Sequence, residues 1–221
     1  MDRIGGPAAY RIAKKLVDRP LRSAFDVVVE RPEQIPAAGP VILAANHRSF
    51  MDSIFLAMTV RRPVAFLAKA EYFDQKRTAW LFRATGQIPV RRGSPGGAKR
   101  ALDAAIDVLR SGGVIGLYPE GTRSRDGLLH RGNLGAARLA LATGAPIVPV
   151  GLIGTAAVQA PGQRLPKIGA RVHVTFGEPI HADPTANHRS QLRDLTHELM
   201  SSIGALCGQP HAREERVLAA V

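Results

Sequence analysis

The pair of residues best suited to do chemistry in this 221-residue sequence is His47 with Asp52, five positions further along the chain. A neutral imidazole accepts a proton from an alcohol, and a carboxylate on its other ring nitrogen fixes the tautomer and stabilises the resulting imidazolium. A continuous helix does not place residues five apart on one face, whereas a turn leading into a helix brings them within hydrogen-bond reach. Two other interpretations stay open. Ser49-x-x-Asp52 resembles a capping box, and His47 fits a loop histidine bonded to backbone.

A second polar segment, Pro119–Ser124, has the groups needed to hold an anion. It combines a flexible Gly121 with the hydroxyl of Thr122 and the guanidinium of Arg123. A planar guanidinium is suited to bidentate hydrogen bonding with phosphate. The alternative is a surface turn in which Arg123 is solvated.

Both segments directly follow short apolar runs, VILAA and VIGLY, and α/β proteins place their sites in loops after strands. Runs of this kind predict strands at Asp26–Glu30, Val41–Ala45, Val64–Lys69, Gln87–Arg91, Val114–Tyr118, Ile147–Ile153 and Arg171–Phe176. Helical spacing predicts helices at Met51–Val60, Thr78–Thr85, Gly97–Ser111, Gly132–Thr143 and Gln191–Leu206. The alternation of strands and helices predicts one α/β domain, with a largely parallel mixed sheet flanked by helices.

We divide the chain into an N-terminal segment (1–25), a catalytic domain (26–207) and a C-terminal tail (208–221). The N-terminal segment can form an amphipathic helix with one apolar face and one mostly basic face, made of Ala9, Ala13, Leu16 and Val17 against Arg11, Lys14, Lys15, Asp18 and Arg19. Basic residues opposite an apolar stripe predict a helix that lies on a membrane surface. An ordinary helix docked on the domain is the alternative.

The charge balance indicates an anionic partner, because 30 Lys and Arg against 18 Asp and Glu give a net charge of +12. Nucleic acid, a phospholipid surface and a phosphorylated small molecule all fit this balance. The single cysteine, Cys207, excludes an intrachain disulfide. Charged residues interrupt the apolar runs near the N-terminus, so we predict no signal peptide and a cytoplasmic-side location. The longest charge-free stretch, Leu139–Gln163, holds three prolines and four glycines, which favours a buried strand over a membrane span.

Taken together, NHRSFMD (46–52) and YPEGTRS (118–124) resemble the first and third motifs of the glycerophospholipid acyltransferase family, with its His-x4-Asp signature. Weaker blocks occur in the expected order: AKAEY (68–72), GQIPVRR (86–92), Arg131-Gly132 and IVPV (147–150). The resemblance covers about residues 40–176. Tyr118 stands where Phe is commoner, a difference that we do not expect to touch the chemistry.

The resemblance implies transfer of a fatty acyl group from an acyl thioester, on coenzyme A or acyl carrier protein, to a hydroxyl of lysophosphatidate or a related glycerol-phosphate acceptor. His47 would be the general base and Asp52 its orienting partner. Arg123 would be the first candidate to bind the acceptor phosphate, and Lys69 the second. Three further roles are implied more weakly: Gly121 and Thr122 let substrate approach, Glu120 braces the loop, and Arg92 belongs either to the site or to the scaffold.

Other functions are weighed against this one. A thioesterase would use the same dyad to activate water and would release free fatty acid without an acceptor. A nucleic-acid-binding protein would account for the charge, but only 5% of the residues are aromatic and no recognisable binding module is present. From Arg61 to Arg131 the 14 basic and 6 acidic residues are spread out, which suits phosphorylated ligands and a phospholipid surface. We therefore expect no nucleic acid, no metal and no cofactor, and a peripheral or monotopic protein at the cytoplasmic face of a membrane.

Overall fold

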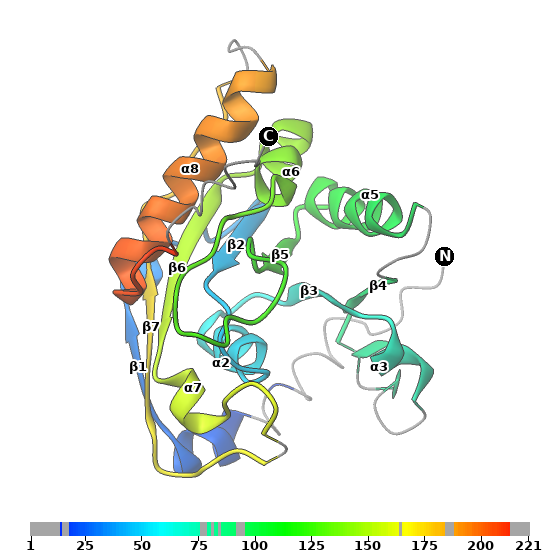
Figure 1. Ribbon diagram of the computed structural model, residues 1–221. Coiled ribbons are helices and arrows are strands. Elements are labelled where there is room, and N and C mark those ends of the chain that lie inside the picture. Colours follow the sequence, from blue (N-terminus) through cyan, green and yellow to red (C-terminus); the bar gives the residue numbers. More distant parts are fainter. Residues whose placement is uncertain are drawn as a thin grey trace, which may run out of the picture.

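Seven strands form one sheet in the part of the chain that the computed structural model describes, residues 14, 18–75, 79–80, 82–83, 85–91, 96–163, 165–183 and 188–212. The strands are β1 (Asp26–Glu30), β2 (Val41–Ala45), β3 (Val64–Lys69), β4 (Ile88–Val90), β5 (Val114–Leu117), β6 (Ile147–Ile153) and β7 (Arg171–Phe176). They lie in the order β1-β7-β6-β2-β5-β3-β4, and only the β6–β7 pair is antiparallel (Figure 1). The predicted single α/β domain with a largely parallel mixed sheet is confirmed, and all seven predicted strands occur within one residue of the expected ends.

The helices of the described residues connect and cover these strands. They are η1 (Pro32–Gln34), α2 (Asp52–Thr59), α3 (Glu71–Asp74), α5 (Gly97–Arg110), α6 (Gly135–Thr143), α7 (Thr155–Val158) and α8 (His188–Cys207). The helix expected at 78–85 lies partly outside the described residues, and its described positions 79, 80, 82 and 83 are helical. α8 begins three residues earlier than predicted.

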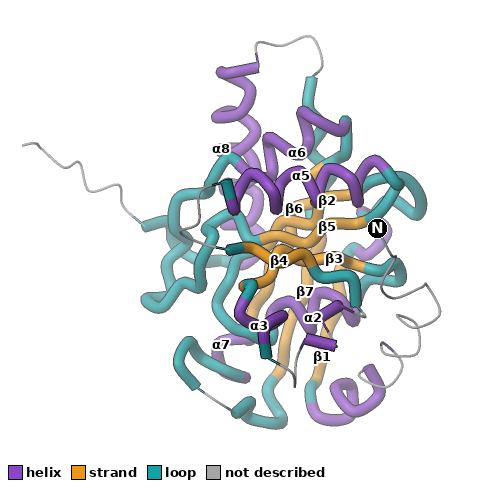
Figure 2. The backbone as a smooth tube through the Cα atoms, turned by 90° about the vertical axis from the view of Figure 1, so that its right-hand side faces the viewer, coloured by secondary structure: helices purple, strands orange, loops and turns teal. Residues whose placement is uncertain are grey.

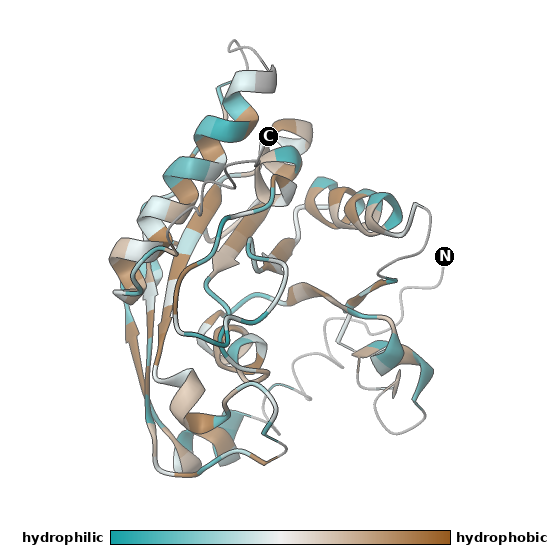
Figure 3. Ribbon diagram, in the orientation of Figure 1, coloured by the Kyte–Doolittle hydropathy of each residue, from teal (hydrophilic) through white to brown (hydrophobic). Residues whose placement is uncertain are grey.

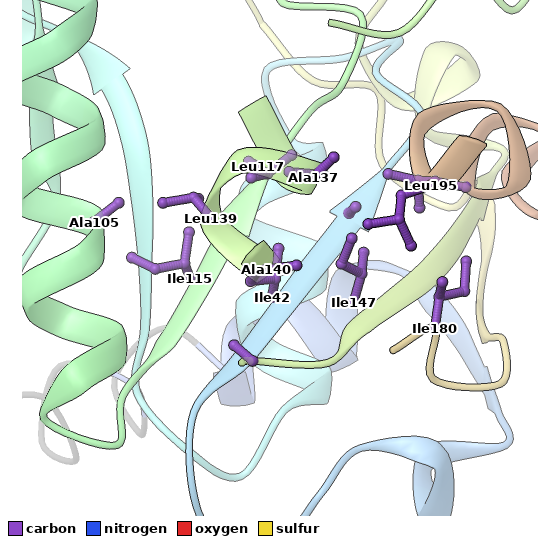
Figure 4. Packing of buried hydrophobic residues seen from close by; sticks show 14 of the residues in the cluster. Ile42, Ala105, Ile115, Leu117, Ala137, Leu139, Ala140, Ile147, Ile180 and Leu195 are labelled. Carbon is purple, nitrogen blue, oxygen red and sulfur yellow. The ribbon is translucent and has the colours of Figure 1, made fainter. Parts of the chain in front are cut away.

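The core has two layers because side chains alternate along each strand. In β2, Ile42 and Ala44 belong to one apolar cluster, while Val41, Leu43 and Ala45 belong to the other. Helices α5, α6 and α8 cover the first face, and α2 and α7 cover the second (Figure 2). Figure 4 shows the first cluster, in which Ala105, Leu139 and Leu195 of the helices meet Ile42, Ile115 and Ile147 of the strands. Hydrophobic residues accordingly follow the strands, and hydrophilic ones are prominent on α8 (Figure 3).

The strand directions bring several chain segments to one edge of the sheet. Strands β2, β3, β4, β5 and β6 all run parallel, so the loops that follow them leave from the same edge, which we call the carboxyl edge. Register places Ala44 of β2 between Leu117 of β5 and Pro149 of β6. The two motif loops, which follow β2 and β5, are therefore neighbours.

Both ends of the chain differ in part from expectation. Most of the predicted N-terminal helix lies outside the described residues, although residues 18–24 are helical. Lys14, assigned to the polar face, donates from Nζ to the carbonyl oxygen of Ala57 at 2.7 Å and pairs with Asp18 at 3.1 Å. The hydrogen bond to Ala57 docks this position on α2 rather than facing it away from the domain, and burial there lowers the pKa of Lys14.

The tail boundary at residue 208 is too early. Gln209 is buried, and Leu129 exchanges backbone hydrogen bonds with Pro210 and Ala212. The packed domain therefore extends to Ala212, the last residue described at this end.

Candidate active site

His47 and Asp52 form a hydrogen-bonded pair at the carboxyl edge, with His47 Nδ1 2.7 Å from Asp52 Oδ2. His47 lies in the loop after β2, and Asp52 is the first residue of α2. The turn from the loop into α2 thus brings His47 and Asp52 into contact, although a regular helix would keep residues five apart on different faces. Asp52 is fully buried, whereas the side chain of His47 is 17% exposed. Because the carboxylate occupies Nδ1, the proton belongs on that nitrogen, and Nε2 is the ring atom able to accept another.

Asp52 also makes one of the two contacts of the predicted capping box. Its Oδ2 accepts the backbone N–H groups of Arg48 at 2.7 Å and Ser49 at 2.8 Å, and the second of these bonds is a capping-box contact. The reciprocal contact is absent, because Ser49 Oγ accepts from Met51 N–H at 3.1 Å and α2 begins at Asp52 without a side-chain cap. One carboxylate oxygen therefore shapes the turn and holds the imidazole at the same time.

Tyr118 stacks directly on the candidate base, a contact that the sequence analysis missed. The rings of His47 and Tyr118 lie 3.8 Å apart between centroids and are inclined by 10°. The Tyr118 hydroxyl shares a hydrogen bond of 2.7 Å with Ser53 Oγ. Desolvation, and then the charge of Asp52, raises the pKa of Tyr118 well above its ordinary value, so the phenol stays neutral. The ring of Tyr118 therefore lies against the candidate base, and its place directly after β5 was the available signal. That the Tyr hydroxyl, in place of the commoner Phe, leaves the chemistry unchanged stays a prediction.

Glu120 connects the loop after β2 with the loop after β5. It is buried, with Oε1 accepting the backbone N–H of His47 at 3.2 Å and Oε2 that of His130 at 3.0 Å. Burial raises the pKa of Glu120, and these backbone hydrogen bonds oppose the rise. A third link runs from Ser124 N–H to the His47 carbonyl oxygen at 2.7 Å. This geometry suits the bracing role predicted for Glu120.

We expect the Glu120→Ala variant to lose about 2 kcal/mol of unfolding free energy, because two part-buried N–H groups lose their acceptor. Glu120→Gln keeps one side-chain carbonyl for one of those groups, so the loss should be smaller. Urea denaturation of both variants beside the wild type measures the difference. Equal stability of Glu120→Ala and the wild type would contradict the bracing role.

The predicted anion-binding groups lie at the carboxyl edge, at the end of β3 and in the loop after β5. Arg123 is half-buried, and Gly121 and Thr122 are exposed in the same turn. Gly121 has a φ of 73°, and a Cβ there would come within 2.9 Å of Asn133 Nδ2, so the turn itself requires glycine. Lys69 ends β3, two strands from β2, where it is exposed and pairs with Glu71 at 3.0 Å. Arg92 lies outside the described residues.

A buried amide pair, also missed from the sequence, fixes the residue before the candidate base. Asn46 donates from Nδ2 to the Leu152 carbonyl oxygen at 2.9 Å and accepts the Leu152 N–H at 2.8 Å. Its Nδ2 also donates to Gln209 Oε1 at 2.6 Å, and Gln209 Nε2 donates to the Gly127 carbonyl oxygen at 2.9 Å. The end of β2 is thus tied to β6 and to the C-terminal segment.

Neither a metal-binding cluster nor a membrane-spanning helix occurs within the described part of the chain. No group of three or more His, Cys, Asp or Glu side chains there is arranged to hold a metal ion. No helix among the same residues combines the length and the apolar character that crossing a bilayer requires.

The chain matches a known class of transferase. The family model described as Acyltransferase matches residues 26–153, which is more than half of the chain, and the chain belongs to this family. The family resemblance found in the motifs is therefore confirmed.

Individual relatives carry a more specific name. The chloroplastic 1-acyl-sn-glycerol-3-phosphate acyltransferase LPAT1 of Arabidopsis thaliana is 29% identical over 171 residues, 77% of this chain and 48% of that protein. The 1-acyl-sn-glycerol-3-phosphate acyltransferase of Borreliella burgdorferi is 36% identical over 133 residues, 60% of this chain and 53% of that protein. The crystal structure of the 1-acyl-sn-glycerophosphate acyltransferase PlsC from Thermotoga maritima has a TM-score of 0.69 and 28% identity, covering 89% of this chain and 80% of that one. The chain spans about half the length of the curated relatives it matches.

Proposed function

We propose that this chain transfers a fatty acyl group from an acyl thioester to the free hydroxyl of lysophosphatidate. The observation that carries the proposal is the buried Asp52 carboxylate bonded to Nδ1 of His47, which leaves Nε2 as a base. The half-buried Arg123 in the neighbouring loop supplies a cation for the acceptor phosphate. The names of the relatives, 1-acyl-sn-glycerol-3-phosphate acyltransferases, support the same acceptor.

In the proposed reaction, His47 Nε2 takes the proton of the acceptor hydroxyl while the hydroxyl oxygen attacks the thioester carbonyl. The new C–O bond forms a tetrahedral intermediate, and the C–S bond then breaks to release the thiolate. The imidazolium returns its proton to that sulfur, so the products are an ester and a thiol. Asp52 stabilises the imidazolium between the two steps. The scheme uses side chains alone and assigns no metal or cofactor.

The donor in this proposal is acyl-CoA or acyl carrier protein carrying the acyl chain as a thioester. The acceptor is a lipid with its own acyl chain, so it is held in a bilayer. We therefore place the reaction at an anionic membrane surface, on the cytoplasmic side, in phospholipid biosynthesis.

The proposal is tested by incubating the purified chain with one acyl-CoA and a panel of acceptors, followed by mass spectrometry of the products. Lysophosphatidate, glycerol 3-phosphate and a lysolipid without a free phosphate form the panel. Phosphatidate as the main product supports the proposal. Free fatty acid released at the same rate with and without acceptor would instead indicate a thioesterase.

Removing the Arg123 guanidinium should weaken acceptor binding. A charge-assisted bidentate contact stabilises by about 1.5–3 kcal/mol, so we expect Arg123→Ala to raise KM for lysophosphatidate about 10- to 100-fold. Arg123→Lys keeps the charge but loses the fork, and its KM should fall between the two. Steady-state kinetics with a saturating acyl donor measures the change.

Arg125, two residues along and exposed, provides the matched control. Arg125→Ala changes net charge by the same amount and should leave KM within about twofold of the wild type. A KM for Arg123→Ala no higher than that of this control would rule out the phosphate-binding role.

A further inference from the structure

Several large apolar side chains are exposed in segments that follow strands of the sheet. Those in the described residues are Phe50, Trp80, Ile153, Leu165 and Ile168. Each lies at or beyond the carboxyl end of β2, β3 or β6. Figures 1 and 2 place α3, α7 and the loop after α7 in the lower half of the molecule, with α3 well apart from α7. Singly exposed apolar residues need no explanation, whereas neighbouring ones in one loop mark a candidate interaction surface.

The two most exposed of these side chains belong to one short loop, residues 159–170, between α7 and β7. Leu165 is 81% exposed and Ile168 is 78% exposed. The loop backbone is nevertheless fixed on both sides, since Lys167 N–H donates to the Val158 carbonyl oxygen at 2.7 Å and Gly169 N–H to that of Ala24 at 2.9 Å. The loop is therefore built to present these two side chains to its surroundings.

Unpaired charges on and beside this loop are positive. No Asp or Glu occurs between residues 151 and 170, and Lys167 stands exposed between Leu165 and Ile168. The hydrogen bond from Gly169 to Ala24 places the helical residues 18–24 beside the loop, with Arg19 and Arg22 exposed. The two nearby carboxylates are each paired with a cation, Asp26 with Arg171 at 2.6 Å and Asp18 with Lys14 at 3.1 Å.

We propose that this loop, with helical residues 18–24, docks on an anionic lipid bilayer and inserts Leu165 and Ile168 below the headgroups. Exposed aliphatic side chains beside unpaired Lys and Arg have the chemistry of such a surface, whereas binding an acidic protein would not require two exposed aliphatic side chains. Docking would turn the carboxyl edge, and with it His47, toward the lipid. This consequence rests on the proposed function, because it explains how an acceptor held in the bilayer reaches the base.

A tryptophan at the tip of the loop tests the insertion directly. Trp80 is the only tryptophan of the chain, so Trp80→Phe removes tryptophan fluorescence. Leu165→Trp is then introduced into this variant. Vesicles of phosphatidylcholine with phosphatidylglycerol should shift the emission of this variant to shorter wavelength. The matched control is Ala37→Trp in the same background, because Ala37 is exposed just before β2 at the opposite edge. Its emission should not move.

A second pair of variants measures binding itself. Burial of each apolar side chain in the bilayer favours binding, so Leu165→Ser with Ile168→Ser should lower vesicle partitioning about tenfold or more in sedimentation assays. Leu165→Phe with Ile168→Phe keeps the apolar surface and should retain binding. Both readouts are independent of turnover, so they stand even if the acceptor panel yields no phosphatidate.

Two outcomes would overturn the proposal. In the first, the chain sediments with vesicles while the emission of the Leu165→Trp variant stays unchanged, which would place the lipid contact elsewhere. In the second, the emission of that variant shifts without vesicles as protein concentration rises, which would make the loop an interface between copies of the chain.

Discussion

Replacing His47 with alanine is expected to lower kcat by at least about 10²- to 10⁴-fold while the fold survives. General-base catalysis contributes a factor of this size, and the proposed scheme assigns the proton transfer to Nε2 alone. The His47 backbone bonds to Glu120 and Ser124 do not depend on its side chain, so the two loops stay joined in the variant. Single-turnover acyl transfer with saturating substrates, beside thermal unfolding of the same samples, measures both quantities.

The matched control for this experiment is His130, whose ring we assign no role. It makes a similar pair, with Nε2 3.0 Å from Asp126 Oδ1, but the two side chains are 44% and 50% exposed. Hydrogen bonds lower the pKa of Asp126 to about 2, the bond from Leu128 N–H contributing most and that from His130 next. This pair differs from His47 and Asp52 because its carboxylate is exposed. His130→Ala should keep kcat within about threefold. A folded His47→Ala protein with the turnover of this control would end the assignment of His47 as base.

The sequence predicted the sheet well because its buried strands are short, continuous runs of apolar residues. VILAA and VIGL are continuous apolar runs too short for helices, as expected of strands covered on both faces, and both are fully buried. Parallel strands end at the same edge, so the loops after Ala45 and Leu117 were expected at one edge of the sheet. The shared edge of the two motifs was therefore predictable from the pattern, although their order along that edge was not.

Contacts that depend on strand order were not within reach. Tyr118 meets His47 because β5 lies beside β2, and Asn46 meets Leu152 because β6 lies on the other side of β2. Sequence spacing carries no information about these neighbours. Gln209 was placed in a loose tail for the same reason, since its partner Asn46 is 163 positions away.

The choice between a catalytic and a capping Asp52 was also wrongly posed. Sequence reasoning treated the two as competing, since each needs the carboxylate. In the structure Oδ2 alone holds the imidazole and accepts two N–H groups of the turn before α2, while Oδ1 is buried without a hydrogen-bond partner among the described residues. Separating the two roles therefore requires variants that remove one and keep the other.

Asp52→Asn is such a variant, and we expect it to lower kcat about 10²- to 10⁴-fold with little loss of structure. The amide oxygen can take the place of Oδ2 and keep the bonds from Arg48 N–H and Ser49 N–H. What disappears is the negative charge that stabilises the imidazolium. Asp52→Ala removes the acceptor as well, so it should lose similar activity and about 2 kcal/mol more of unfolding free energy. Asp52→Asn with kcat within about threefold of the wild type would show that the charge is not used.

Combining the changes tests whether Asp52 acts through His47. Groups that work as a unit have strongly non-additive effects, because once one is removed the other has nothing left to assist. The double variant His47→Ala with Asp52→Asn should therefore be no slower than His47→Ala alone. If the two losses instead multiply, Asp52 contributes by a route that does not pass through the imidazole, and the bond from Nδ1 to Oδ2 would be a feature of the turn rather than of the reaction. Single-turnover rates for the four proteins, measured with one acyl-CoA and lysophosphatidate, decide between these outcomes.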